Sequence, residues 1–273
     1  MPKRMFLYLL IMSITGTVLG QNRDSADRVY KINTRVEIPV TVAAAGYTMY
    51  GFAQESKKSG STPAIVNALK ISDLNWLDRW GVRPYNRSVD KLSYLPFDAA
   101  VPYPIIFLAL DKKMRKDYVK LLFLYTQAMT LTGALYTSAV HYVNRYRPLV
   151  YSPESPMDIR ISSNARNSFF AGHVALVATS AFFMAQVYND YHPESHLRGL
   201  MYSIAGAATL TTGYLRSRAG EHFLSDIVLG TTVGTLSGLL TPKLHKAKWI
   251  KNQRLSIIPF TGPSSGLAVL YKP

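Results

Sequence analysis

Apolar segments recur along the chain and alternate with shorter polar or proline-containing stretches. The segments that predict helices cover residues 36–53, 98–111, 117–143, 168–187, 197–215 and 223–240. A membrane-spanning helix needs about 20 mostly apolar residues, and every segment except 98–111 is close to that length or longer. The pattern predicts an all-α fold, a multi-span membrane bundle of five to six apolar helices.

Segment 98–111 fits a membrane span poorly, because it is short and contains Pro102 and Pro104. We expect it not to cross the bilayer. The mean hydropathy of +0.04 is low for a bundle in which every helix spans a membrane, so a soluble all-helical protein remains the alternative. Several segments are rich in Gly, Ala, Ser and Thr, which lets helices approach each other closely.

The N-terminus has the layout of an export signal. Lys3 and Arg4 precede an apolar run at residues 5–12, and small residues follow up to Gly20. This order is typical of a signal peptide at residues 1–20 that is cleaved after Gly20. An uncleaved N-terminal anchor is the alternative.

Composition divides the rest of the chain into three parts. Residues 21–97 contain an N-terminal apolar helix and a polar insert at 54–97, residues 98–242 contain the main helical bundle, and residues 243–273 form a basic tail. For the insert, short amphipathic helices that lie on the membrane or cap the bundle stand against a plain connecting loop. In the tail, two β-prone runs flank Thr-Gly-Pro-Ser-Ser, which predicts a small β-hairpin.

The chain is strongly basic and has no cysteine. Its formal net charge of +15 and pI of about 9.9 suit nucleic acid or an anionic membrane surface. The sequence shows no basic patch with interleaved aromatic residues and no nucleic-acid-binding module, so we expect phosphates and lipid headgroups as partners, and no nucleic acid. The lack of cysteine excludes disulfides, thiolate nucleophiles and thiolate-bound metals.

Two lysine-rich segments predict the orientation in the membrane. They are residues 112–116 and the tail after Pro242. The positive-inside rule puts both in the cytoplasm, so the loops at the other ends of the helices face the periplasm. A chain that starts outside the cytoplasm after signal cleavage fits this orientation only if one early segment, 98–111, does not cross.

The stretch Arg216–Asp226 carries the strongest chemical signal. His222 and Asp226 are four positions apart, so on a helix the carboxylate can accept the imidazole N–H and leave the other ring nitrogen basic. Arg216 and Arg218 supply guanidinium groups that suit tetrahedral oxyanions. The combination indicates a site that handles phosphate.

Two earlier segments, Asn144–Pro148 and Ser168–His173, complete a known pattern. With the Arg216–Asp226 stretch they resemble the type 2 phosphatidic acid phosphatase and vanadium haloperoxidase superfamily, whose blocks read K-x6-R-P, P-S-G-H and S-R-x5-H-x3-D. The resemblance covers roughly residues 100 to 240. The matching residues are Arg147 and Pro148 in the first block, Gly172 and His173 in the second, and Arg216, His222 and Asp226 in the third.

Several positions depart from this pattern. The departures are Val140 in place of the lysine, Phe170 and Ala171 in place of the proline and serine of the second block, and Leu215 in place of the serine of the third. Arg218 is too close to His222 to be the arginine in register. The lost lysine and serine weaken the pocket, and Arg145 or His141 could restore charge from a nearby position.

The resemblance implies a metal-independent phosphatase that hydrolyses a lipid phosphate or a polyprenyl diphosphate through a phosphohistidine intermediate. His222 would attack the phosphorus, Asp226 would orient its ring, and His173 would protonate the departing alkoxide. The residues that it implies for phosphate binding are Arg147, Arg216 and, through its backbone N–H, Gly172. It implies neither a cofactor nor a metal.

Other functions remain open. A catalytically silent lipid-phosphate-binding scaffold fits the losses at Val140 and Ala171, a soluble periplasmic acid phosphatase keeps the chemistry without the membrane, and a vanadate-binding haloperoxidase keeps the pocket. A transporter and a zinc site on His173, His222 and Asp226 are the remaining alternatives. The leading expectation is an enzyme of a bacterial-type inner membrane with its active site facing the periplasm.

Overall fold

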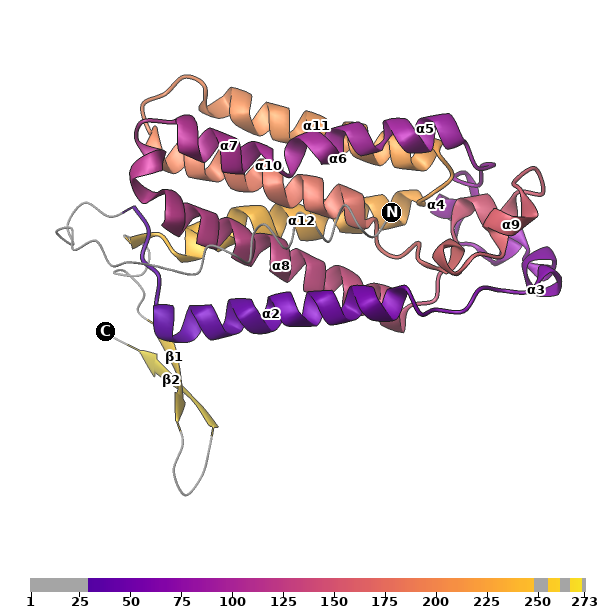
Figure 1. Ribbon diagram of the computed structural model, residues 1–273, viewed down its shortest axis with the longest axis horizontal. Helices are drawn as coiled ribbons and strands as arrows, with labels where there is room; N and C mark the ends of the chain where they lie inside the picture. The colour runs from indigo at the N-terminus through magenta and orange to yellow at the C-terminus, as the bar shows by residue number, and fades with distance from the viewer. Residues whose placement is uncertain (1–28, 248–254, 261–265, 272–273) are drawn as a thin grey trace.

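An elongated bundle of long helices makes up most of the molecule (Figure 1). The computed structural model describes residues 29–247, 255–260 and 266–271, so the expected signal peptide at 1–20 lies outside the described residues. The long helices are α2 (Thr34–Glu55), α8 (Tyr118–Tyr142), α10 (Gly172–Tyr191), α11 (Arg198–Arg218) and α12 (Leu224–Leu244). The helical bundle predicted from the apolar segments is confirmed within this part of the chain.

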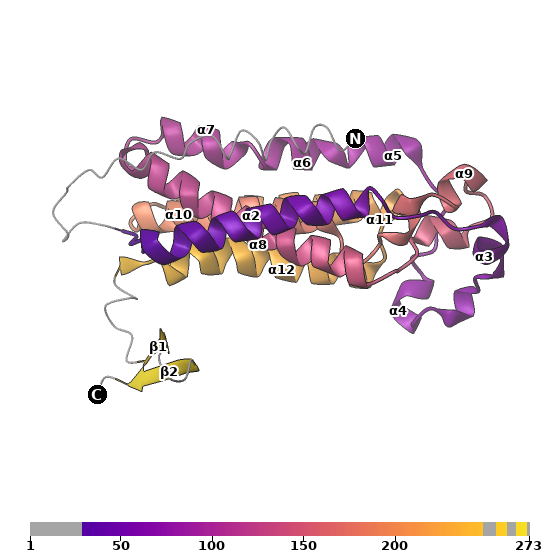
Figure 2. The same ribbon diagram turned by 60° about the horizontal axis from the view of Figure 1, so that its bottom comes forward.

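Three short helices continue one another along the bundle (Figures 1 and 2). They are α5 (Arg87–Leu92), α6 (Tyr94–Ala100) and α7 (Tyr103–Leu110), and η2 (Met114–Asp117) then leads into α8. Pro102 and Pro104 lie at the start of α7, where a missing backbone N–H does not break a helix. Among the described residues, 87–110 and Leu224–Leu244 are long and apolar enough to cross a membrane. The premise that 98–111 is short is therefore wrong, because the helical rod begins at Arg87.

Helix α10 lies at the centre and packs against α8, α11 and α12. Gly230, Gly234 and Gly238, at every fourth position of α12, face it. A Cβ atom at Gly234 would lie 2.1 Å from the carbonyl oxygen of Ala175, and one at Gly238 would lie 2.5 Å from that of Thr179. Glycine is required at these positions because the two backbones touch, as the small-residue pattern predicts.

Helix α2 packs along α8 in a similar way. A Cβ atom at Gly51 would lie 2.3 Å from Thr137, and one at Gly133 would lie 2.6 Å from Thr48. The two helices therefore run in the same direction and end side by side. The chain that leaves α2 after Glu55 starts next to the C-terminal end of α8.

A cap of short helices covers this end of the bundle (Figures 1 and 2). It contains α3 (Pro63–Ala68), η1 (Ile71–Asp73) and α4 (Trp76–Arg79) from the insert, and η3 (Pro148–Tyr151), α9 (Met157–Arg160) and η4 (Ser163–Arg166) from the connection between α8 and α10. Val66 of the insert packs in one small core with Leu149, Val150 and Ala165. The polar insert is thus folded against the connection between α8 and α10 and shares a small core with it.

Near the C-terminus two antiparallel strands, β1 (Leu255–Phe260) and β2 (Gly266–Tyr271), pair with Leu255 opposite Tyr271. They lie where the sequence predicts a hairpin, and its turn at 261–265 lies outside the described residues. At the end of the bundle opposite the cap, Tyr30 pairs with Lys246. The beginning of the described chain and the end of α12 therefore meet at that end.

Candidate active site

The predicted site residues come from four places in the sequence and meet at the capped end. Arg147 follows α8, Gly172 and His173 begin α10, Arg216 lies in the last turn of α11, and His222 and Asp226 flank the start of α12. Burial holds the pKa of His222 well below its usual value, and the charges of Arg147 and Arg216 lower it further. His173 lies close enough to act in the same direction. The four side chains therefore share one environment, in which the imidazole of His222 is uncharged at neutral pH.

Two buried guanidinium groups share one carboxylate. Arg147 and Arg216 are only 5% and 2% exposed. Glu221 forms an ion pair with Arg147, and its Oε2 lies 2.9 Å from an Nη of Arg216. The Nε atoms of both arginines are buried and have no hydrogen-bond partner among the described residues. The space between the guanidinium groups is therefore an anion position, which the carboxylate of Glu221 fills.

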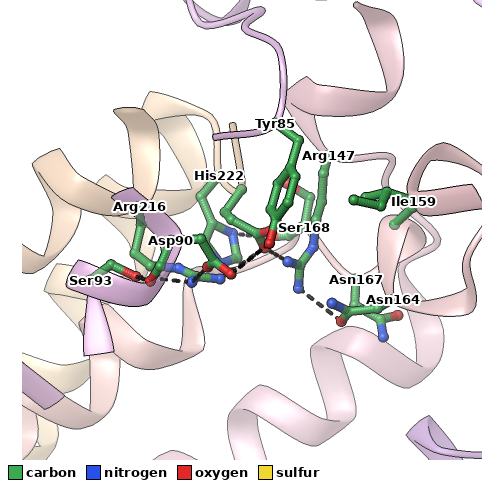
Figure 3. A network of polar contacts seen from close by, with 12 residues as sticks. Tyr85, Asp90, Ser93, Arg147, Ile159, Asn164, Asn167, Ser168, Arg216 and His222 are labelled. Atoms are coloured by element: carbon green, nitrogen blue, oxygen red, sulfur yellow. Dashed lines mark hydrogen bonds and ion pairs between the residues drawn. The ribbon is translucent and has the colours of Figure 1, made fainter. Parts of the chain in front are cut away.

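Further polar groups hold each arginine in place (Figure 3). Arg216 donates to Asp90 at 2.7 Å and to Ser93 at 3.2 Å. Arg147 donates to Asn164 at 3.0 Å. A guanidinium that is held by several acceptors presents its remaining N–H groups in a fixed direction. The anion position is thus formed before any ligand enters.

His222 has one tautomer fixed by the backbone. Its Nδ1 lies 2.8 Å from the carbonyl oxygen of Ser168, and because a carbonyl can only accept, Nδ1 carries the proton. The Nε2 atom is then left with its lone pair. Since the ring is 2% exposed, water competes little for this nitrogen, which suits a nucleophile or base.

Asp226 acts on His222 indirectly, which corrects the expected hydrogen bond between the two side chains. Its Oδ2 accepts the hydroxyl of Ser168 at 2.6 Å and the backbone N–H of Phe223 at 3.1 Å, while Oδ1 pairs with Arg145. The carboxylate lies in the first turn of α12, where it satisfies a free N–H group of the helix. It therefore positions Ser168, and the carbonyl of Ser168 positions the imidazole.

His173 and Gly172 begin helix α10. The ring of His173 packs edge-on against Tyr94 and Phe97, with centroids 4.9 and 5.0 Å apart. A Cβ atom at Gly172 would lie 2.6 Å from the ring of Tyr136, so only glycine fits there. The N-terminus of a helix attracts anions through its free N–H groups and its dipole, and here it points at the group of histidines and arginines.

Gly220 makes the turn that delivers Glu221 and His222 to the site. Its φ of +77° is a left-handed conformation, and it follows the end of α11 at Arg218 and the C-cap Ala219. Glycine adopts this conformation without strain and commonly ends helices in this way. Any other residue would also press its Cβ to 3.0 Å from the carbonyl oxygens of the insert.

The three auxiliary candidates do not lie in the anion position. Arg145 forms ion pairs with Asp78 and Asp226, so its charge is already balanced and does not replace the missing lysine. Arg218 and His141 are exposed, and the ring of His141 packs against its neighbour in the sequence. Among the described residues no group of three or more His, Asp or Glu side chains could hold a metal ion.

Several residues of the site were not predicted from the sequence. They are Glu221, Ser168, Asn164, Asp90 and Ser93. Two of them had a usable signal, because Glu221 adjoins His222 and Ser168 opens the second sequence block. Asp90 and Ser93 had none, since Asp90 is 126 positions away from Arg216 along the chain.

Comparison with known proteins assigns the segment that carries these residues. Residues 121–250 match the family model of the PAP2 superfamily, and all three sequence blocks lie within this segment. This segment is thus assigned to the type 2 phosphatidic acid phosphatase superfamily, which confirms the resemblance. The insert and helices α2 to α7 lie outside the matched segment.

No curated protein matches the sequence. Among solved structures, a similar one is described as the first transmembrane PAP2-type phosphatidylglycerolphosphate phosphatase from Bacillus subtilis, with 19% sequence identity, a TM-score of 0.46 and coverage of 78% of this chain and 98% of that chain. The assignment to the superfamily depends on the family model and the three blocks and not on this similarity.

Proposed function

We propose that this chain is a metal-independent phosphatase that uses His222 as its nucleophile. The observation that carries the proposal is the anion position between Arg147 and Arg216 beside the neutral imidazole of His222. In the first step, Nε2 of His222 forms a bond to phosphorus while the bond from phosphorus to the leaving oxygen breaks. The two guanidinium groups and the N-terminus of α10 stabilise the charge on the phosphate oxygens.

His173 takes the role of the general acid and base. It gives a proton to the departing oxygen, so that the leaving group departs as an alcohol or, from a diphosphate, as a monophosphate. The negative charge of the bound substrate favours the protonated imidazole that this step needs. In the second step the neutral ring takes a proton from water, which attacks the phosphohistidine and releases inorganic phosphate and free His222.

Substrate binding requires Glu221 to leave the anion position. Its carboxylate and a phosphate group need the same guanidinium donors, so they exclude each other. The exchange keeps Arg147 and Arg216 paired with an anion throughout, which avoids leaving two buried positive charges uncompensated. Glu221 thus fills the position in the resting enzyme and competes with substrate.

We infer that the substrate is a lipid phosphate or diphosphate held at a membrane. Large apolar side chains are exposed along the outer faces of the long helices, among them Val36, Val40 and Val42 of α2, Leu210 and Tyr214 of α11, and Val228 and Leu236 of α12. Apolar exposure on this scale indicates contact with lipid. Trp76 and Trp80 of the cap are 75% and 84% exposed, and tryptophan gathers at membrane–water interfaces. The site lies at the same end, near the level of the headgroups.

The orientation that we propose places the site on the periplasmic side of a bacterial-type inner membrane. The lysine-rich loop at 112–116 lies at the end of the bundle opposite the cap (Figure 1), and the positive-inside rule assigns that end to the cytoplasm. Val29 lies at the same end as this loop, so this orientation also places Val29 on the cytoplasmic side. A reporter fused after Lys116 tests the orientation: a periplasmic signal there would reverse it.

The proposed reaction is tested by phosphate release from the purified chain in detergent across a panel of lipid phosphates and diphosphates, with His222→Ala alongside. We expect release by the parent, no release by the variant, and an acid-labile phosphorylated intermediate in the parent alone. Equal rates for the two proteins would remove the enzymatic proposal.

A catalytically silent lipid-phosphate binder is the second candidate. It is favoured by Val140 and Ala171, which stand where the superfamily pattern has a lysine and a serine. Binding of lipid phosphate without release by either protein in the same assay would support it. Oxidation of bromide by the vanadate-loaded chain would instead support the haloperoxidase alternative.

A further inference from the structure

Lys58 lies just after α2 and points into the protein. Its ammonium group donates to the backbone carbonyl of Val140 at 2.8 Å and to Oδ1 of Asn167 at 2.9 Å. The side chain is half-buried, whereas the neighbouring Lys57 is exposed. Lys58 belongs to the insert, outside the segment 121–250 that matches the superfamily.

Asn167 connects Lys58 with the residues around the anion position. Asn167 adjoins Ser168, whose carbonyl oxygen accepts the N–H of His222. Asn164, which holds Arg147, lies in the 3-10 turn η4 that ends just before Asn167, and Figure 3 shows both asparagines beside Arg147. The charges of Arg147 and Lys58 both act on the carboxylate of Glu55. Lys58 therefore lies on the Arg147 side of the anion position and is separated from that arginine by Glu55 and Asn167.

Both hydrogen-bond acceptors of Lys58 are neutral groups. Burial lowers the pKa of Lys58, and the charge of Arg166 lowers it further, while Glu55 offsets part of this effect. Glu55 is itself engaged, because it accepts hydrogen bonds from Tyr136 and Asn167. An ammonium in this setting gains from a further negative charge beside it.

We propose that Lys58 is a third cationic group of the phosphate site, which the insert supplies and which contacts an oxygen of the bound phosphate. The proposal rests on the proposed function. Lys58 would supply the positive charge that the sequence blocks lack. Its ammonium group donates a hydrogen bond to the carbonyl of Val140, the residue that stands in the lysine position of the superfamily pattern. The position in the chain differs, yet the charge reaches the same end of α8.

The alternative role for Lys58 is purely structural. Val140 lies in the last turn of α8, and lysine side chains often stabilise such carbonyl groups at helix ends. Removing a helix cap lowers stability but leaves the affinity for phosphate unchanged. The affinity of the folded protein for phosphate therefore separates the two roles.

The test compares Lys58→Met, Lys58→Arg and the control Lys57→Met in the full chain purified in detergent. For inorganic phosphate we expect Lys58→Met to raise Kd by on the order of tenfold to a hundredfold, as loss of a hydrogen bond to a charged group does. Lys58→Arg keeps the charge and should stay within about threefold of the parent, and Lys57→Met should match the parent. An unchanged Kd for Lys58→Met, with or without a lower Tm, would overturn the proposal.

The same measurement on a His222→Ala background separates this proposal from the proposed reaction. That variant forms no phosphohistidine, so phosphate binding is read without turnover. If His222→Ala hydrolyses substrate as fast as the parent, the reaction fails while the effect of Lys58→Met on Kd still reports on Lys58. If Lys58→Met binds phosphate as the parent does, the Lys58 proposal fails and the reaction stands.

Discussion

The segment that matches the superfamily and the insert that precedes it contribute to the site in different ways. Residues 121–250 supply the histidines and the guanidinium groups of the three sequence blocks. The insert supplies groups that pair with those charges: Asp78 with Arg145, and Asp90 with Arg216. The residues that would react thus lie in the three sequence blocks, whereas several of the carboxylates that neutralise their arginines lie outside these blocks.

This difference separates the groups that the sequence blocks provide from the groups that are specific to this chain. A buried guanidinium needs a partner to be tolerated, and the motifs alone do not provide enough partners. Arg216 obtains one from α5 and one from Glu221. A related chain with another insert would have to balance the same arginines with different carboxylates.

The largest effect is expected inside the matched segment, from His173→Ala. Loss of a general acid slows release of an alkoxide by about 10²–10⁴-fold. A substrate with an acidic leaving group, such as p-nitrophenyl phosphate, needs little protonation and should lose far less. The ratio of kcat/KM for a lipid phosphate and for this ester, in parent and variant, measures the difference. Equal losses on both substrates would contradict the role of His173.

A smaller effect is expected in the insert, from Asp90→Ala. Arg216 loses a 2.7 Å charged hydrogen bond, which should lower the free energy of unfolding by about 1.5–3 kcal/mol and reduce kcat/KM because the guanidinium is less well oriented. Asp98→Ala is the matched control, since Asp98 is exposed. Thermal unfolding and steady-state kinetics measure both effects. A variant that behaves like the control would reduce the insert to a passive cover.

Glu221→Gln should change binding in the opposite direction. The amide no longer competes as an anion for Arg147 and Arg216, so inorganic phosphate should bind on the order of tenfold more tightly. Without phosphate, the variant should have a lower Tm than the parent, because two buried charges have lost a carboxylate. Added phosphate should raise the Tm of the variant more than that of the parent. Weaker phosphate binding by the variant would show that Glu221 is not a competitor.

The smallest effect concerns pH. Burial and the two arginines lower the pKa of His222 below its usual value near 6.5, so below about pH 6.5 the unfolded chain takes up a proton more readily than the folded protein. The stability that the neutral ring contributes is therefore present above that pH and is lost as the pH falls toward the folded pKa. The Tm of the parent should fall more steeply than that of His222→Gln below pH 6.5. Parallel Tm curves would contradict the shift.

The sequence predicts the parts of this molecule that depend on local information. Apolar segments of bilayer length become α2, α8, α10, α11 and α12, because burying an apolar face or contacting lipid requires no knowledge of distant residues. The three sequence blocks also come together as expected. The length of segment 98–111 was underestimated because its helical rod starts at Arg87 in the polar insert, and its expected failure to cross the membrane stays a prediction.

The contacts that the sequence does not predict join residues far apart in the chain. Spacing correctly places His222 and Asp226 near each other, yet the hydrogen bonds pass through Ser168, which is 54 and 58 positions away from them. The carboxylate of Asp226 contacts the backbone N–H of Phe223 and the guanidinium of Arg145 instead of the imidazole of His222. Only the folded chain shows that Lys58 reaches the end of α8.

The glycine stripe of α12 has a consequence for the reaction centre. Because Gly234 and Gly238 bring the backbones of α10 and α12 into contact, they set how the first turns of these helices are aligned, and one histidine stands at or just before each first turn. The distance between the two imidazole rings therefore depends on contacts in the middle of the bundle. A single methyl group added at one of these glycines would push the two helices apart and change that distance.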